Sequence, residues 1–197
     1  MEDHNMNTRA LRIFTTAVIG LGVLAGCSDS AGSSDSAGSA DHNAADVTFA
    51  TEMIPHHRQA VQMAELATDR AASPEVLALA EEIRSAQQPE IDTMAGLLEE
   101  WGEPVPDDMG GTDMGGMGDM PGMLTEEQLA DLEAADGAPF DQMFLEAMID
   151  HHTGAIQMAQ TEQQDGSSQA AIDLAKQIEE AQTVEIDQMR ALLANNE

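Results

Sequence analysis

The sequence predicts an all-α protein, an antiparallel four-helix bundle built from two repeated helical hairpins. First, the chain aligns with itself without a gap at an offset of 95 residues, so that Phe49 matches Phe144. Second, apolar residues recur three and four positions apart in each repeat, as on the buried face of a helix. Third, the composition is poor in sheet formers, with no Tyr, one Trp and four Phe. Two hairpins of this kind bury their apolar faces most simply against each other.

The first residues predict an export signal rather than part of the fold. Arg9 and Arg12 precede an apolar stretch, and residues 24–27 read Leu-Ala-Gly-Cys. This order is similar to a bacterial lipoprotein signal, in which Cys27 is acylated and becomes the first mature residue. The apolar stretch is shorter than the roughly 20 residues that span a bilayer. We therefore expect a lipoprotein signal peptide at 1–26 and a protein lipid-anchored to the outer face of the cell membrane or in the periplasm.

A flexible tether is expected at 27–45, because its core at 32–40 is Gly, Ser, Ala and Asp with nothing to bury. The four-helix bundle domain follows at 46–197. Its expected parts are repeat one at 46–100 with helices near 46–69 and 74–100, a Met- and Gly-rich linker at 101–137, and repeat two at 138–197 with helices near 139–163 and 168–195.

Local signals support these boundaries. Asp46 and Asp141 lie at the starts of the first helix of each repeat, where a negative charge suits the helix N-terminus. Residues 73–75, Ser-Pro-Glu, read as an N-cap, a proline in the first turn and an acidic first turn. Residues 125–128 read as a capping box that opens a short helix, which Gly137 is expected to end.

Charge and cysteine content exclude some classes of partner and site. The formal net charge is -30, from 7 Lys and Arg against 37 Asp and Glu, which excludes a nucleic-acid partner on electrostatic grounds. The same charge concentrates cations near the surface, although it is equally explained as a solvated acidic shell. Cys27 is the single cysteine, so the folded part has neither an intramolecular disulfide nor a thiolate metal site.

Polar residues occupy positions on the predicted buried faces where Leu or Ile would be expected. Burying imidazole, amide or carboxylate groups without partners costs a few kcal/mol each, so these groups require a polar network or a metal. One interpretation is a hydrogen-bond network that sets helix register. The other is metal ligation, because Met53 and Met148 stand three and four residues before a His pair and share its helix face. The candidate ligands are His56, His57, His151, His152, Met53, Met148, Met94, Met189, Glu90 and Glu185.

Ligand softness favours copper among the metals. Thioether with imidazole suits Cu(I), imidazole alone suits Cu(II) or Zn, and carboxylate with imidazole suits Fe. The Glu-x-x-His motif of di-iron bundles is missing, and Glu52, which precedes His56 by four residues, has Ala147 as its repeat equivalent. Copper is therefore the expected metal, with Zn or Fe as alternatives.

The paired histidine segments carry a family resemblance. Residues 46–64 (DVTFATEMIPHHRQAVQMA) and 140–159 (FDQMFLEAMIDHHTGAIQMA) resemble the twin signatures of the domain of unknown function 305 (DUF305) family. The resemblance covers about residues 41–193. It implies a ferritin-like bundle and, as in CopM-type members, extracytoplasmic copper binding through the helix histidines and neighbouring methionines, with His42 as an extra ligand.

These patterns together predict a lipoprotein that binds copper and sequesters or transfers it in copper homeostasis, and they indicate no particular catalytic activity. Its partners would be metal ions, the membrane through Cys27, and a copper-delivery protein. The linker methionines would act as a low-affinity capture arm. The alternatives are a ferritin-like di-iron or copper redox enzyme, and a structural envelope lipoprotein whose polar core only sets register.

Overall fold

The structure, a computed structural model, describes residues 41–107 and 120–195 of the chain. Five α-helices and no strand occur in those ranges. They are α1 (Ala44–Arg70), α2 (Pro74–Trp101), α3 (Glu126–Ala134), α4 (Ala138–Asp165) and α5 (Gln169–Asn195). The predicted all-α class is confirmed, and the four long helices begin and end close to the predicted positions.

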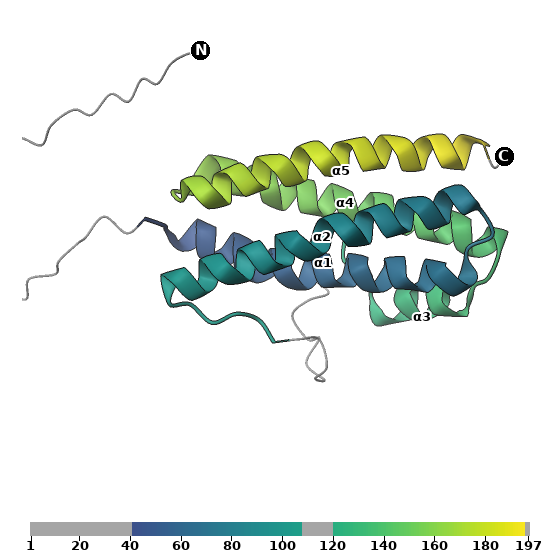
Figure 1. The fold of residues 1–197 in the computed structure, drawn as a ribbon, viewed down its shortest axis with the longest axis horizontal. Coiled ribbons are helices and arrows are strands. Elements are labelled where there is room, and N and C mark those ends of the chain that lie inside the picture. Colours follow the sequence, from purple (N-terminus) through teal and green to yellow (C-terminus); the bar gives the residue numbers. More distant parts are fainter. Residues whose placement is uncertain (1–40, 108–119, 196–197) are drawn as a thin grey trace, which may run out of the picture. The chain divides into compact units, whose positions relative to one another are not determined.

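The long helices form two antiparallel hairpins, α1 with α2 and α4 with α5, which lie against each other with the short α3 on the outside (Figure 1). Contact between the hairpins runs mainly along α1 and α4. These two helices are antiparallel, because the amide of Gly137, just before α4, donates to the carbonyl of Arg70 at the end of α1, at 2.8 Å. The first helices of the two repeats therefore cross in their middles, where each carries its His pair.

The helix ends follow from local sequence. Asn43 caps α1, accepting from the amides of Ala45 and Asp46, and Ser73 caps α2 directly before a proline. Thr125 and Gln128 form the predicted capping box of α3.

The apolar core consists of two clusters, one on each side of the His pairs. In α1, one cluster ends at Ile54 and the other begins at Ala60. In α4, one ends at Met148 and the other begins at Ala155. The histidines thus form a polar layer across the middle of the bundle, with a dry core above and below it.

The structure differs from the predicted boundaries in three places. Helix α1 begins at Ala44, inside the range predicted as tether, because Asn43 supplies its cap. Gly137 does not end the short helix, which stops at Ala134, but precedes α4 with a positive φ of 67°. Two residues of the segment predicted as a Met- and Gly-rich linker, Met123 and Leu124, are buried. Most of the linker methionines, at 109, 114 and 117, lie outside the described residues.

Candidate metal site

Four histidine rings meet in the middle of the bundle. His56 and His57 on α1, and His151 and His152 on α4, are all fully buried. The rings of His56 and His151, which occupy equivalent positions in the two repeats, lie with their centroids 3.8 Å apart. Helical periodicity alone does not say which ring of each pair points inward. Both do, because α1 and α4 present adjacent positions to each other and to the second helix of their own hairpin.

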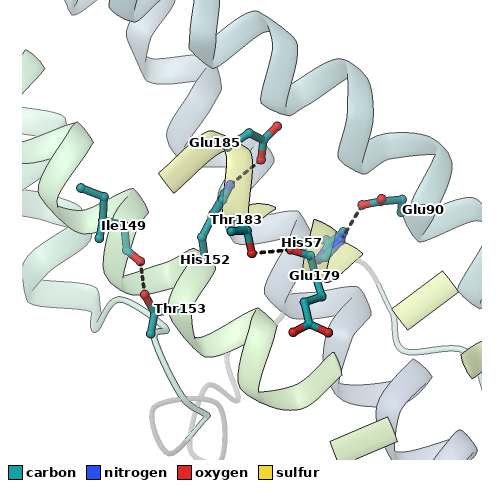
Figure 2. A network of polar contacts seen from close by, with 8 residues as sticks. All are labelled: His57, Glu90, Ile149, His152, Thr153, Glu179, Thr183 and Glu185. Atoms are coloured by element: carbon teal, nitrogen blue, oxygen red, sulfur yellow. Dashed lines mark hydrogen bonds and ion pairs between the residues drawn. The ribbon is translucent and has the colours of Figure 1, made fainter. Parts of the chain in front are cut away.

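Two of the rings pair with carboxylates from the second helix of the same hairpin. The Nε2 atom of His57 lies 2.9 Å from Glu90 Oε2 on α2, and that of His152 lies 2.8 Å from Glu185 Oε2 on α5 (Figure 2). The glutamate side chains retain 19% and 15% of their exposure, whereas the imidazoles have none. Each carboxylate therefore stands between a buried ring and solvent.

Most of the other ring nitrogens of this layer have no hydrogen-bond partner among the described residues. They are the Nδ1 atoms of His56, His57 and His152, and both ring nitrogens of His151. Burial, and to a smaller extent the proximity of His57, lower the pKa of His56 to about 3. Burial also lowers the pKa of His151 well below its ordinary value. These rings are therefore neutral at physiological pH, the form that binds a metal.

Buried thioethers flank the histidine layer on both sides. Met53 and Met94 belong to one apolar cluster and Met148 and Met189 to the other, and all four are fully buried. Each hairpin thus contributes an equivalent set of two histidines and two methionines. Gln87 and Gln182, one turn before the glutamates, are also buried, and their amide atoms find no partner in the described part of the chain.

A short linker segment, residues 120–124, crosses α1 and α4 at the histidine layer, and we call it the strap. The carbonyl of Pro121 lies 3.0 Å from His56 Nε2. The side-chain amide of Gln59 makes two hydrogen bonds to the backbone of Leu124. Its Nε2 donates to the carbonyl of Leu124 at 3.0 Å, and its Oε1 accepts from the amide of Leu124 at 2.7 Å. Gly154 lies directly under the strap, where an added Cβ would overlap the carbonyl of Pro121. The strap thus covers His56 and breaks the twofold equivalence of the two repeats.

Equivalent aspartates tie the two hairpins together. Asp141 at the start of α4 accepts from the amides of Ala72 and Ser73, in the turn of the other hairpin, at 3.0 and 2.8 Å. Asp46 at the start of α1 accepts in the same way from the turn between α4 and α5, including the amide of Ser168 at 2.8 Å. Sequence reasoning placed both aspartates at helix starts but did not predict that each would bind the turn of the other hairpin.

Asp46 also lies beside a buried carboxyl, that of Glu162. Burial raises the pKa of Glu162 to about 8, assisted by Asp46 and by the charge of Asp165. Burial also raises the pKa of Asp46, but the adjacent carboxyl of Glu162 and hydrogen bonds from nearby backbone amides bring it below its ordinary value. A protonated Glu162 beside Asp46 avoids two adjacent buried negative charges.

The predicted ligands are brought to one layer, but not as a preformed coordination sphere. In residues 41–107 and 120–195, no three His, Asp or Glu side chains converge as a metal site. His42 is placed apart: it stacks on Trp101, with ring centroids 4.7 Å apart. It lies before the start of α1 at Ala44, which precedes His56 by twelve residues, or roughly 18 Å along the helix axis. His42 therefore does not join the histidine layer. Cys27 lies outside the described residues.

Sequence reasoning also missed the strap, although the repeat held a signal for it. Gln59 and Gly154 occupy equivalent positions in the two repeats yet differ completely in size and chemistry. Gln59 forms hydrogen bonds with the strap, and Gly154 has no side chain that would overlap it. A local failure of repeat symmetry thus marked the place where a third segment meets the bundle.

Comparison with known proteins places this site in a family context. A sequence model described as a domain of unknown function, DUF305, matches residues 46–193. Among solved structures, a DUF305 protein from Streptomyces coelicolor that is described as secreted is 34% identical with a TM-score of 0.69, covering 80% of this chain and 95% of its own. A DUF305 fragment from Deinococcus radiodurans is 28% identical with a TM-score of 0.68, covering 78% and 97%.

A further structural relative was solved with metals. CopM in its Cu(II)-bound form is 33% identical with a TM-score of 0.65, covering 76% of this chain and 96% of its own. CopM is also known in Cu(I)-bound and Ag-bound forms. No curated protein matches the chain. None of the helices in the described part of the chain is long and apolar enough to cross a membrane.

Proposed function

Since the chain belongs to the DUF305 family, we propose that it is an extracytoplasmic lipoprotein that binds copper in its histidine layer and sequesters it or hands it on. Residues 1–26 would direct export, Cys27 would carry the lipid, and a copper-delivery protein would be the partner. The observation that carries the proposal is a layer of four buried imidazoles, each with at least one ring nitrogen that has no partner among the described residues. Burial keeps two of them, His56 and His151, neutral. Burying a polar nitrogen without a partner costs free energy, and a bound metal would offset that cost.

The donor set favours a soft metal. Imidazole and thioether together suit Cu(I), and imidazole alone suits Cu(II). No three histidines and carboxylates converge among the described residues. We therefore infer that the buried methionines complete the site, which favours Cu(I) over Fe. The copper- and silver-bound forms of CopM support the same metal class.

The arrangement fits reversible binding better than catalysis. The metal is the cargo in this proposal, and release follows from ligand exchange at thioethers and imidazoles. The second candidate, a copper or di-iron redox enzyme, requires oxygen-dependent turnover. The third, a structural lipoprotein, requires that no metal binds.

The thioethers offer the cleanest test. Replacing Met53, Met94, Met148 and Met189 with Leu nearly preserves side-chain volume and removes the sulfur. We expect the fold to remain, and Cu(I) affinity in anaerobic competition with a chromophoric chelator to fall by at least tenfold. Met143→Leu, a half-buried residue of α4 outside the histidine layer, is the control and should leave affinity unchanged.

The histidines are tested with the same assay. Replacing all four with Asn, which keeps a polar group in the layer, should abolish stoichiometric binding of Cu(I) and Cu(II). Circular dichroism checks that the variant is still helical. Unchanged copper binding in a folded variant would refute the site, and oxygen consumption by the copper-loaded protein would favour the enzyme.

A further inference from the structure

Three of the four buried rings use the same nitrogen for a hydrogen bond. Nε2 of His57 meets Glu90, Nε2 of His152 meets Glu185, and Nε2 of His56 meets the carbonyl of Pro121. An ionised carboxylate and a carbonyl can only accept a hydrogen bond, so each Nε2 must carry the proton. In a neutral imidazole the lone pair is then on Nδ1.

The surroundings of Nδ1 favour this tautomer. Nδ1 of His57 and Nδ1 of His152 are buried and have no acceptor in the described residues. A proton there would be an unsatisfied buried donor, which costs about 1–3 kcal/mol. The neutral ring with Nε2–H and a bare Nδ1 avoids that cost.

The geometry points to Nδ1 of His57 and His152 as the atoms that ligate the metal, with Glu90 and Glu185 acting as positioning residues and not as ligands. This inference rests on the proposed function and deepens it. It departs from the sequence-based prediction, which placed both glutamates among the ligands. Each carboxylate holds its ring from the solvent side, since the glutamates are partly exposed and the imidazoles are not.

Such a partner does two things for a histidine ligand. It holds the ring in one orientation and tautomer, and it raises the basicity of the other nitrogen. Because Nε2–H is retained when Nδ1 binds, no proton leaves these rings. Ligation through Nε2 would instead break the bond to the glutamate and require the proton to move to Nδ1.

The strap extends the same arrangement to one further ring. The carbonyl of Pro121 holds His56 Nε2, whereas His151, the repeat equivalent, has both nitrogens without a partner in the described part of the chain. The tautomer of His151 is therefore not set by a partner of the kind that holds His56, His57 and His152.

Long-range ¹H–¹⁵N spectra of the histidine-labelled full chain test the inference. In the metal-free protein we expect His57 and His152 as Nε2–H tautomers. On adding Ag(I), a diamagnetic probe, we expect the resonance shift at Nδ1 while Nε2 stays protonated. A shift at Nε2 would overturn the inference and leave the proposed function standing. Absence of silver and copper binding would overturn the proposed function and the ligand assignment together, whatever the tautomer.

Variants of the glutamates supply an independent readout. In Glu90→Gln with Glu185→Gln, the amide oxygen still accepts from Nε2–H, so we expect the tautomer to persist and affinity for Ag(I) to fall only a few-fold. Replacement of both by Ala should lower affinity by roughly 10- to 100-fold. The control, Glu82→Ala with Glu180→Ala, removes the same charge from exposed positions of α2 and α5 and should change little. Equal losses for Gln and Ala would identify the carboxylates as ligands and refute the inference.

Discussion

Gly154→Ala probes the seating of the strap on the bundle. Gly154 lies inside α4 and is buried beneath the strap. An added Cβ would overlap the carbonyl of Pro121 and come within 2.8 Å of the amide nitrogen of Gly122. These are backbone atoms, so no side-chain rotation relieves the clash. Either the strap lifts, which breaks its hydrogen bond to His56, or α4 shifts away from it.

The expected cost follows from three contributions. Overpacking a well-packed site costs about 1–3 kcal/mol. Loss of the bond between Pro121 and His56 adds about 1 kcal/mol. Replacing Gly by Ala inside a helix offsets about 1 kcal/mol of this. The free energy of unfolding should therefore fall by about 1–3 kcal/mol, which for a domain of this size is a decrease in Tm of roughly 3–10 °C.

Gly96→Ala is the matched control, because Gly96 lies inside α2 and an added Cβ there meets nothing within 4 Å. This variant should be stabilised by up to about 1 kcal/mol from helix propensity alone. Urea unfolding followed by circular dichroism measures both variants against the unchanged protein. If Gly154→Ala is as stable as Gly96→Ala, the strap does not lie where the structure puts it.

Two further predictions concern the buried carboxyls. Asp141→Ala removes the acceptor for the amides of Ala72 and Ser73, and we expect the free energy of unfolding measured in urea to fall by about 2–3 kcal/mol. Asp141→Asn should lower it less. A decrease below about 0.5 kcal/mol for Asp141→Ala would contradict the role of Asp141 in joining the hairpins. Glu162 has a folded-state pKa of about 8, above its ordinary value of 4.5, so its contribution to stability is fully present below about pH 4.5 and is lost as pH rises through 8. Glu162→Gln has no proton to lose at this position, so its Tm should rise relative to that of the unchanged protein from pH 5 to pH 9. A Tm difference that is independent of pH would refute the raised pKa of Glu162.

The parts of the fold that the sequence predicted are those encoded by local periodicity and by the repeat. Spacings of three and four residues indicate a helix without knowledge of its partner, because burial on one face is a property of the helix itself. Caps such as Ser73 and Thr125 act within three residues and are equally readable. The repeat added the pairing of two similar hairpins, and hence the expectation that His56 and His151 are equivalent.

Tertiary structure alone decided how the equivalent residues differ in role. That both rings of each pair are buried follows from the packing of α1 on α4, which periodicity cannot specify. The sequence predicted Glu90 as a ligand, whereas the structure pairs it with His57. A position along a helix indicates the face on which a carboxylate lies, but not the atom that it contacts. The strap contacts His56 and not His151, although the two repeats have the same motif. Such asymmetry arises between segments far apart in the chain, where no local rule applies. The sequence by itself therefore determined the two histidine helices and the types of candidate ligand, and only packing determined which ring nitrogens have no hydrogen-bond partner among the described residues.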